Sequence, residues 1–355
     1  MPKLKALVLS GGRGTRLRPL TFTLAKQLIP LANKPVLGYV LDQVAETGVT
    51  EIGVIIAPET GNYVKEYVKD GAEWSLNATY IPQEPLGLAH AVKTAKPFLG
   101  EENFIMCLGD NLQGQGLTAF VEKFKKEKMD ALILLKPVDD PTKFGVATLD
   151  ENANITQLVE KPKNPQSNLA IVGTYIFSKN IFNAIDRIKP SWRGELEITD
   201  AVQEMINLGF KVKAETLHTW WLDTGKKDDI LTANAKVLDT YTKQDILGAV
   251  RDSKIEGRVT VQRNAKVINS TIRGPCMIGD GCIIENSFIG PYTSVGNGTK
   301  IVDSSIEYSV ILDDAQIVGV HRLEESLIGK NAKITRNHRS GCLKLHVGDY
   351  SEVEI

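Results

Sequence analysis

The first residues that could do chemistry lie in a loop rich in glycine and arginine. The loop is the stretch LSGGRGTRLRPLT at residues 9–21, and it follows the apolar run KALVL. Glycines let a backbone turn tightly and present its N–H groups to an anion, and the guanidinium of Arg16 offers a planar pair of donors to phosphate oxygens. The alternative is an ordinary glycine-rich turn with solvated arginines. The composition of the loop favours phosphate binding.

The loop matches neither of two familiar phosphate-binding motifs. A dinucleotide fingerprint needs a third glycine where Leu17 stands. A P-loop needs Gly-Lys at a fixed distance from its first glycine, and neither Gly11 nor Gly12 has it. A phosphate site here is therefore of another kind.

The elements that would position this loop alternate in type up to about residue 225. Short runs of Val, Ile and Leu, such as EIGVIIAP and NFIMCLGD, alternate with longer amphipathic stretches. This alternation is typical of βαβ units and predicts an α/β, Rossmann-like domain with a mostly parallel sheet buried on both faces. Ligands of such sheets gather at the carboxyl ends of the strands, and the loop follows the first predicted strand.

The pattern changes at about residue 244 and becomes repetitive. Rows of equal length begin at Ile255, Ile272, Ile289 and Ile306, and within a row Ile or Val recurs at every sixth position. This is the signature of a hexapeptide repeat, in which each row forms one triangular coil of a left-handed parallel β-helix and the aliphatic side chains fill its axis. We therefore predict a first domain over 1–244 and a β-helix over 245–355.

Two details of the repeat carry predictions of their own. The regularity slips after Val318 and resumes at Ile328, which predicts an insertion or a turn between them; the final segment from His338 receives no assignment. Cys276 and Cys282 occupy the small-residue position of successive rows, so we interpret them as packing residues.

Composition excludes several classes of function. The 355 residues carry a formal net charge of −1 with both signs interspersed, which argues against a nucleic-acid or membrane-surface partner. Four cysteines without a CxxC pair, and the lack of a basic-then-apolar leader, predict a cytoplasmic protein. No apolar run approaches the roughly 20 residues that cross a bilayer.

The wider stretch GGRGTRLRPLTFTLAKQLIPLANKP resembles the signature of the sugar-phosphate nucleotidyltransferases, in which GGxGTRLxPLT is followed by a lysine, by (L/I)P and by NKP. Further segments match this family in order from this stretch up to Gly225. They are PLGLAHAV (85–92), LGDN (108–111), FGVA (144–147), VEKP (159–162), VGTYIF (172–177), RGELEITD (193–200) and WLDTG (221–225). With a β-helical tail appended, the chain is most similar to the long thymidylyltransferase members of the family.

The resemblance implies an enzyme that joins a nucleoside triphosphate to a sugar 1-phosphate and releases pyrophosphate. The expected substrates are dTTP and glucose 1-phosphate, and the expected product is dTDP-glucose, a precursor of other dTDP-sugars. UTP or a broader set of sugar 1-phosphates is the alternative, because a methyl group on the base contributes only about 1–3 kcal/mol of discrimination. The nucleophile is already an anion, so catalysis should depend on positioning and charge neutralisation.

The resemblance also implies the catalytic residues. Arg16 and Lys26 match the cations that contact the triphosphate, and Asp110 and Asp223 match the two carboxylates that hold Mg²⁺, the expected cofactor. Read alone, each aspartate would be a turn residue. Mg²⁺ favours a site in which few ligands come from the protein and the metal also binds phosphate oxygens.

The sugar-phosphate residues come from matched segments of the second half of this domain. Lys161 and Arg193 match the phosphate clamp, and a carboxylate such as Glu160 can accept hydrogen bonds from two hydroxyls of a hexose. Glu197 and Asp200 receive a structural interpretation. The full matched set is Gly145, Glu160, Lys161, Gly173, Tyr175 and Arg193.

The nucleotide residues come from the first loop and from the region around residue 85. Gln83 is suited to pair with the N3–H and O4 edge of thymine or uracil, and Gln27 after the motif lysine resembles the thymidylyltransferases. The full matched set is Leu9, Gly11, Gly12, Gly14, Thr15, Arg16, Gln27, Gln83 and Gly87.

Two other functions stay open at this point. β-Helical domains of this repeat type often carry acetyl-CoA-dependent acetyltransferase activity, and His321 could act as its base, although a lone histidine in a loop is more often solvated. Alternatively, the chain is a regulatory subunit with a decayed site, which the presence of every motif cation and carboxylate argues against. The open edges of the coils predict a homo-oligomer.

Overall fold

The computed structural model describes residues 4–12, 14–336 and 345–354. They form two compact units. The units are Met1–Arg13 with Leu37–Asp223, and Gly14–Val36 with Thr224–Ile355. The domain boundary that we propose at residue 244 lies between helix α8 (Lys227–Tyr241) and strand β14 (Asp245–Ile246). Within the described residues, no helix has the length and apolar character that a membrane span requires.

A nine-stranded sheet forms the centre of the first unit, in so far as the structure describes it. Strands β6, β1, β4 and β5 run parallel, which matches the Rossmann-like prediction. Strand β11 runs antiparallel to β6, β8 and β9, so the complete sheet is mixed. The strands are β1 (Leu4–Ser10), β4 (Glu51–Ile56), β5 (Asn77–Pro82), β6 (Asn103–Leu108), β8 (Ala131–Pro137), β9 (Gly145–Leu149), β10 (Ile155–Glu160), β11 (Leu169–Phe177) and β12 (Val212–Thr216).

The sheet is buried on both faces, as the continuous apolar runs predict. Leu7 and Val8 are neighbours on β1, point to opposite faces and are both fully buried. Helices α3, α4, α6 and α7 contribute to the core on the face of Leu7. The helices of this unit are α1 (Val36–Ala45), α2 (Gly61–Val68), α3 (Leu88–Thr94), α4 (Lys96–Leu99), α5 (Thr118–Glu127), α6 (Ile181–Ile185) and α7 (Ile198–Asn207).

A separate two-stranded ribbon follows the carboxyl end of β6. It consists of β7 (Asn111–Gln113) and β13 (Trp221–Asp223), which pair antiparallel although they are far apart in the chain. The ribbon therefore brings the last residues of the first unit to the middle of its chain, near a strand end, where ligands of α/β sheets bind.

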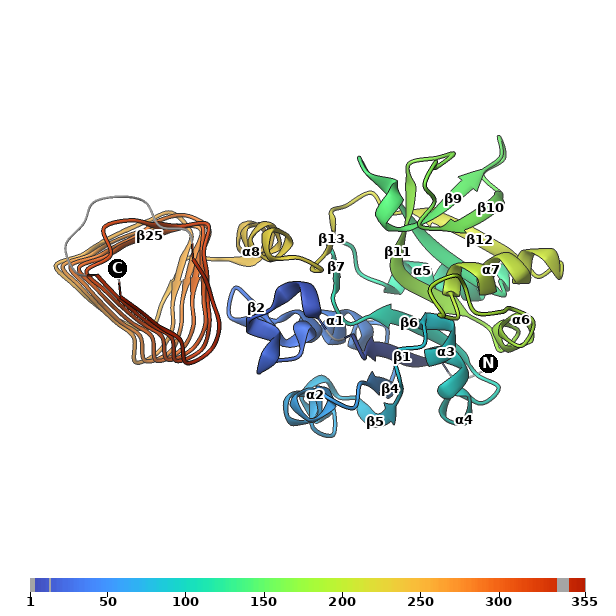
Figure 1. Ribbon diagram of the computed structural model, residues 1–355, viewed down its shortest axis with the longest axis horizontal. Helices are drawn as coiled ribbons and strands as arrows, with labels where there is room; N and C mark the ends of the chain where they lie inside the picture. Colours follow the sequence, from blue (N-terminus) through green and yellow to red (C-terminus); the bar gives the residue numbers. More distant parts are fainter. Residues whose placement is uncertain (1–3, 13, 337–344, 355) are drawn as a thin grey trace. The chain divides into compact units, whose positions relative to one another are not determined.

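The β-helix of the second unit has three parallel faces, and its stacked coils have a triangular outline (Figure 1). The aliphatic residues that the repeat predicts to be axial, such as Ile272, Ile278 and Ile284, are fully buried. The first face contains β14, β17 (Val259–Val261), β20 (Cys276–Ile278), β23 (Thr293–Val295), β26 (Val310–Ile311), β29 (Leu327–Ile328) and β31 (His346–Val347). The second contains β15 (Ala249–Arg251), β18 (Lys266–Ile268), β21 (Ile283–Glu285), β24 (Lys300–Val302), β27 (Gln316–Val318), β30 (Lys333–Thr335) and β32 (Glu352–Glu354). The third contains β16 (Lys254–Glu256), β19 (Thr271–Arg273), β22 (Phe288–Ile289), β25 (Ser305–Glu307) and β28 (Leu323–Glu324).

The predicted interruption after Val318 is wrong. Leu323 pairs with Ile306 at the same spacing that separates Ile306 from Ile289, because leucine fills the axis as well as isoleucine does. The spacing shortens earlier in the chain, where Ile311 pairs with Val295. The repeat therefore loses a single position before Ile311 instead of gaining residues after Val318.

The final segment, which the sequence left unassigned, adds strands to two faces. β31 pairs parallel with β29, and β32 pairs parallel with β30. Residues 337–344, including Cys342, lie outside the described residues.

The remaining part of the second unit is a compact segment that precedes α1. It contains three short 3-10 helices, η1 (Thr15–Leu17), η2 (Leu20–Phe22) and η3 (Lys26–Leu28), and a hairpin of β2 (Pro30–Leu31) and β3 (Lys34–Pro35). Helix α8 contacts strand β2 of the hairpin and strand β23 of the β-helix.

Candidate active site

The ribbon of β7 and β13 brings Asp110 and Asp223 together. Asp223 lies opposite Asn111 in the register of the ribbon, and Asp110 is the residue before Asn111. The Asn111 side-chain amide donates to Oδ1 of Asp110 at 3.2 Å and accepts from the Trp221 indole N–H at 2.9 Å. Asn111 therefore holds both sides of the ribbon, a role that its place in the LGDN motif did not suggest.

These two carboxylates fit the Mg²⁺ that we expect. Asp110 is buried with 6% of its surface exposed, and it follows the carboxyl end of β6. The described residues contain no cluster of three or more His, Cys, Asp or Glu that could hold a metal by itself. Two carboxylates that leave the other coordination positions to water and phosphate oxygens suit Mg²⁺ better than a closed protein site does.

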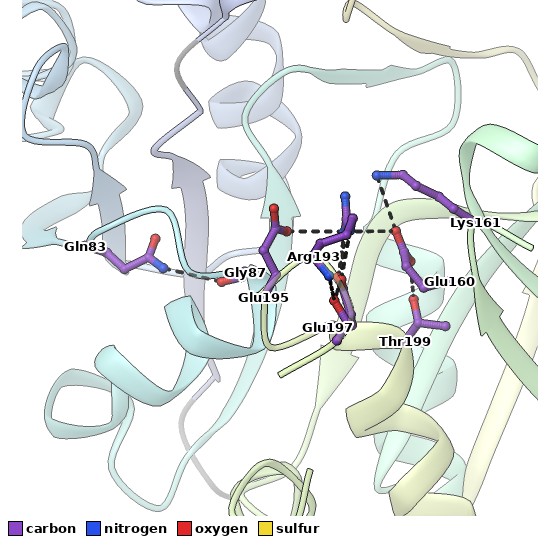
Figure 2. Close-up of polar contacts among 9 residues, drawn as sticks. Gln83, Gly87, Glu160, Lys161, Arg193, Glu195, Glu197 and Thr199 are labelled. Carbon is purple, nitrogen blue, oxygen red and sulfur yellow. Dashed lines mark hydrogen bonds and ion pairs between the residues drawn. The ribbon is translucent and has the colours of Figure 1, made fainter. Parts of the chain in front are cut away.

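A second cluster joins the predicted sugar-phosphate residues Glu160, Lys161 and Arg193 (Figure 2). The Arg193 guanidinium lies 2.8 Å from Glu197, 3.2 Å from Glu195 and 3.5 Å from Glu160. Lys161 Nζ also lies 3.5 Å from Glu160. Two cations thus flank one carboxylate, and a role of this cluster in binding a sugar phosphate stays a prediction.

Glu197 and Thr199 hold this cluster in place, which agrees with the structural interpretation of Glu197; the sequence assigned no role to Thr199. Glu197 is buried and accepts from Nε of Arg193 at 3.1 Å and from Nη2 at 2.9 and 2.8 Å. The Thr199 hydroxyl donates to Oε2 of Glu160 at 2.7 Å. A Cβ added at Gly145 would lie 2.8 Å from that hydroxyl oxygen, so Gly145 leaves room for it.

The charges of the cluster shift two pKa values upward. Burial acts to lower the pKa of Arg193, and the hydrogen bonds and charges of the surrounding glutamates outweigh it, so the net shift is upward and the cation is retained. Burial raises the pKa of the Asp200 carboxyl, and the charges of Glu197 and Glu160 act in the same direction. The cluster therefore keeps its cation and disfavours one further negative charge.

Two of the predicted sugar residues belong to the core. Tyr175 is 4% exposed and stacks on Phe177, and burial followed by the charge of Glu160 raises its pKa. A Cβ added at Gly173 would lie 2.5 Å from Leu108 Cδ1. The structure thus gives both residues a packing role, and their contact with a sugar stays a prediction.

The predicted base-binding residues of the first unit also lie close together. Nε2 of Gln83 lies 3.0 Å from Nδ1 of His90 and 3.4 Å from the Gly87 carbonyl oxygen (Figure 2 shows the second contact). Gly87 has φ of 106°, and a Cβ there would lie 2.3 Å from the carbonyl oxygen of Leu196. Only glycine fits this position, where the loop of Gly87 meets the loop that carries Arg193.

The end of β1 is tied to the end of β6. The Leu9 carbonyl oxygen accepts from the Gly109 N–H at 2.9 Å, one residue before Asp110. Gly11 and Gly12 follow β1, and a Cβ added at Gly11 would lie 3.7 Å from Oε1 of Gln83. Leu9 and Gly11 are therefore neighbours of the predicted metal and base residues respectively.

The second unit carries the other predicted nucleotide residues, and it brings two of them together. Gly14 has a left-handed backbone with φ of 63° and precedes η1, whose first residues are Thr15 and the exposed Arg16. A Cβ added at Gly14 would lie 2.9 Å from Cβ of Lys26. The Thr21 hydroxyl closes the turn by donating to the Gly14 carbonyl oxygen at 2.7 Å.

Gln27 follows Lys26 and is almost completely buried, with 1% of its surface exposed. Its Oε1 atom has no hydrogen-bond partner among the described residues. A buried amide oxygen without a donor is costly, which gives a reason to expect a ligand donor there. The role of Gln27 in nucleotide binding stays a prediction.

The β-helix cysteines are packing residues, as predicted. Cys276 and Cys282 are fully buried, and burial raises the pKa of each thiol to about 12. His321, the candidate acetyltransferase base, is exposed on the β-helix and borders an open groove. The groove is lined by Asn269, Thr271, Arg273, Asn286, Ser287, Phe288, Asp303, Ser304, Ser305 and His321.

A Rossmann-like sheet with two carboxylates on its terminal ribbon, together with a cation cluster in the same unit, has the features of a nucleotide-transferring enzyme. The chain belongs to the nucleotidyl transferase family, whose profile matches residues 5–240. It is 46% identical over 356 residues to a glucose-1-phosphate thymidylyltransferase of Streptomyces antibioticus, with 99% of each chain covered.

Two further relatives match a smaller share of the chain. A UTP–glucose-1-phosphate uridylyltransferase, AglF of Haloferax volcanii, is 33% identical over 243 residues, which cover 68% of this chain and 99% of the relative. A solved Bacillus anthracis protein, proposed to be a glucose-1-phosphate thymidylyltransferase and in complex with sucrose, is 33% identical with a TM-score of 0.63. That match covers 67% of this chain and 96% of the other. The chain is therefore an enzyme of sugar-phosphate nucleotidyl transfer with a long C-terminal extension.

Proposed function

We propose that the chain uses Mg²⁺ to transfer the nucleotidyl group of dTTP to glucose 1-phosphate, which produces dTDP-glucose and pyrophosphate. The similarity over nearly the full length to a relative of that name supports the substrates. The observation that carries the proposal is the pairing of β7 with β13, because it sets Asp223 opposite the neighbour of Asp110.

The proposed reaction is an in-line displacement. A phosphate oxygen of glucose 1-phosphate forms a bond to the α-phosphorus of dTTP while the bond from that phosphorus to the leaving oxygen breaks, and the electron pair departs with pyrophosphate. Mg²⁺ held by Asp110 and Asp223 would neutralise charge on the phosphate oxygens. No protein base is needed because the attacking oxygen is already anionic near neutral pH.

The side chains of this protein bind and orient the two substrates. We assign Arg193 and Lys161 to the phosphate of the sugar and Glu160 to its hydroxyls, since two cations beside one carboxylate match the charges of a hexose 1-phosphate. We assign Arg16 and Lys26 to the triphosphate, where they counter charge on the α-phosphate and on pyrophosphate.

UTP is the second candidate nucleotide. The similarity of the chain to the uridylyltransferase AglF, which is named for UTP, favours this candidate. Gln83 can pair with the edge that thymine and uracil share, so only the methyl group distinguishes them. That group contributes about 1–3 kcal/mol of discrimination. The expected preference for dTTP over UTP is therefore roughly 10- to 200-fold.

A matrix of five nucleoside triphosphates against several sugar 1-phosphates tests the proposal. Pyrophosphate release is measured with and without Mg²⁺, and the highest rate is expected for dTTP with glucose 1-phosphate in the presence of Mg²⁺. The variant Asp110→Ala should abolish release. Asp186→Ala is the matched control, because Asp186 pairs with Lys93 at the surface and has no part in the site.

Undiminished turnover by Asp110→Ala would refute the assignment of the metal site. Turnover of a purine nucleotide in preference to dTTP and UTP would refute the assignment of the base. Acetyl-CoA with glucosamine 1-phosphate, followed by mass spectrometry, checks the acetyltransferase alternative at His321.

A further inference from the structure

The hairpin that follows Lys26 has an unusual turn. Its two central residues, Ala32 and Asn33, have φ of 45° and 63°, and both are therefore left-handed. Asparagine adopts this conformation readily, but alanine does not. The turn therefore needs partners outside the hairpin to keep its shape.

One buried side chain, Asn234 of α8, supplies the main partner. Its Oδ1 accepts from the Ala32 N–H at 2.9 Å and from the Ser294 hydroxyl at 3.0 Å, and its Nδ2 donates to the Tyr292 carbonyl oxygen at 3.1 Å. Asn234 is fully buried, and these bonds join three separate segments of the second unit. A buried amide whose oxygen and nitrogen are both hydrogen-bonded favours one arrangement of its neighbours.

Two more contacts hold the same segment against the β-helix. Nδ2 of Asn33 donates to the Val295 carbonyl oxygen at 2.7 Å. On the other side of Lys26, the Thr23 hydroxyl donates to Asp349 at 2.6 Å. The residues before and after Lys26 are thus both hydrogen-bonded to coils of the β-helix.

The hold on the hairpin extends to Lys26 itself. The Leu28 N–H donates to the Ala25 carbonyl oxygen at 2.8 Å, and the Val36 N–H donates to the Ile29 carbonyl oxygen at 3.2 Å, so η3 and the hairpin form one hydrogen-bonded stretch. Gly14, in the turn that leads to Arg16, packs against Cβ of Lys26. A displacement of the hairpin tip would therefore displace both cations assigned to the triphosphate.

We infer that Asn234 is a positioning residue for nucleotide binding, through which the β-helix holds the segment that carries Arg16 and Lys26. The inference rests on the proposed function, because it needs those two cations to bind the triphosphate. AglF is matched over 99% of its length within 68% of this chain, so family members can reach full length without all of these elements. The β-helix then has a specific task in this chain, which is to support the hairpin.

The test compares Asn234→Leu with wild type in full steady-state kinetics. The Leu side chain fills the space but removes all three hydrogen bonds. We expect KM for dTTP to rise at least about tenfold, with KM for glucose 1-phosphate within about twofold of wild type. Asn234→Asp keeps an acceptor for Ala32 and loses the donor to Tyr292, so its effect should be intermediate.

Asn286→Gly is the matched control, because it removes the side-chain amide and keeps the left-handed backbone of this position, with φ of 47°. Asn286 also bonds through its amide, but within the ladder of Asn269 and Asp303 on the β-helix surface, so neither KM should change. Asn33→Gly keeps the left-handed turn and removes only the bond to Val295, so it reports on the same link if Asn234→Leu does not fold. Its KM for dTTP should rise about threefold.

Two results would overturn the inference. One is that wild type is active and that the folded Asn234 and Asn33 variants keep its KM for dTTP. The other is a rise in KM of the same size for both substrates, which indicates a general loss of structure. Failure of the proposed function gives a different result, since wild type and Asn286→Gly would then also release no pyrophosphate from dTTP and glucose 1-phosphate.

Discussion

The β-helix and the sheet unit bring side chains together over very different distances along the chain. In the β-helix, Asn269 donates to Asn286 and Asn286 donates to Asp303, each 17 residues further on. In the sheet unit, the indole of Trp221 donates to Asn111, 110 residues away. In a repeat, the spacing along the sequence therefore predicts which residues become neighbours. In a site assembled from distant segments, it does not.

The same difference predicts how each region responds to a substitution. Within the β-helix a coil packs only against the coils beside it, so a change in the axis should lower stability locally and leave the sugar-phosphate cluster unaffected. In the sheet unit one guanidinium is shared by Glu160, Glu195 and Glu197, so a single change there alters several interactions at once. The following predictions test this contrast.

Replacement of Arg193 should have the largest effect. Arg193→Ala removes a cation from the proposed phosphate site and leaves the buried Glu197 without its cationic partner. We expect kcat/KM for glucose 1-phosphate to fall roughly 10³-fold and stability to fall by about 3–5 kcal/mol. Pyrophosphate release and urea unfolding measure the two effects.

Arg187→Ala is the control for that variant. Arg187 is exposed and lies 4.0 Å from Glu204, so its loss should change stability by no more than about 1 kcal/mol. Arg193→Lys should recover little activity, since lysine lacks the planar guanidinium that pairs with both oxygens of Glu197. Wild-type kinetics in Arg193→Ala would show that the cluster is structural only.

An axial residue of the β-helix should affect stability alone. Ile284 is fully buried in the axis, so Ile284→Ala should cost about 2–5 kcal/mol. Its neighbour Ile283 is half-buried and lies off the axis, and Ile283→Ala should cost less than about 1 kcal/mol. Urea unfolding checks both values. A changed KM for glucose 1-phosphate in Ile284→Ala would contradict the independence of the two regions.

The repeat made the β-helix predictable because burial follows the constant spacing of its rows directly. Ile255, Ile272, Ile289 and Ile306 pair with one another in the structure as their spacing predicts. The wrong prediction concerned the segment after Val318, and it arose because leucine at 323 was not counted as an axial residue. Pattern alone therefore describes this region almost completely.

The site was predictable only in part. The motifs identified Asp110 and Asp223, but only the ribbon pairing shows how residues so far apart meet. The partners of Glu197 and Asn234 could not be predicted, because a buried polar residue has no sequence signal for its partner. The antiparallel strand β11 was missed for a similar reason, since an apolar run has the same composition in either direction.

Glycine substitutions should distinguish the two regions at a smaller scale. Gly145→Ala places a Cβ 2.8 Å from the Thr199 hydroxyl in a buried site, which should cost about 1–3 kcal/mol. Gly281 in a β-helix turn has open space but φ of 65°, so Gly281→Ala should cost about 1 kcal/mol. Urea unfolding of the two variants measures these costs.

A second substitution at each position separates space from backbone conformation. Asn264 and Asn331 occupy the turn position of Gly281 in other coils, with φ of 58° and 57°, so Gly281→Asn should be nearly neutral. Thr199→Ala should reduce the cost of Gly145→Ala by removing the clashing hydroxyl. Equal effects of Ala and Asn at 281 would show that backbone conformation does not limit that turn.

The smallest effect concerns two acidic residues whose pKa values shift in opposite directions. Burial, followed by the charges of Glu197 and Glu160, raises the pKa of Asp200 in the site. The hydrogen bonds of Lys254 and then Arg273 lower the pKa of Glu256, which is partly exposed on the β-helix. One carboxylate therefore opposes folding when it is ionised, and the other favours it.

The signs of these two contributions follow from proton linkage. The folded state binds the Asp200 proton more tightly than the unfolded chain, so its cost is complete at neutral pH and shrinks as the pH falls through the raised pKa. Asp200→Asn should therefore raise Tm slightly at pH 7, and the gain should diminish toward acid pH. Glu256→Gln should lower Tm slightly at pH 7, because the ionised carboxylate of Glu256 stabilises the fold above its unfolded pKa. This contribution is lost as the pH falls through the lowered pKa of the folded state, so the difference between the variant and wild type should disappear there. Thermal melts from pH 8 to about pH 3 measure both differences, and a gain for Asp200→Asn that grows toward acid pH would show that this carboxylate is stabilised by the cluster.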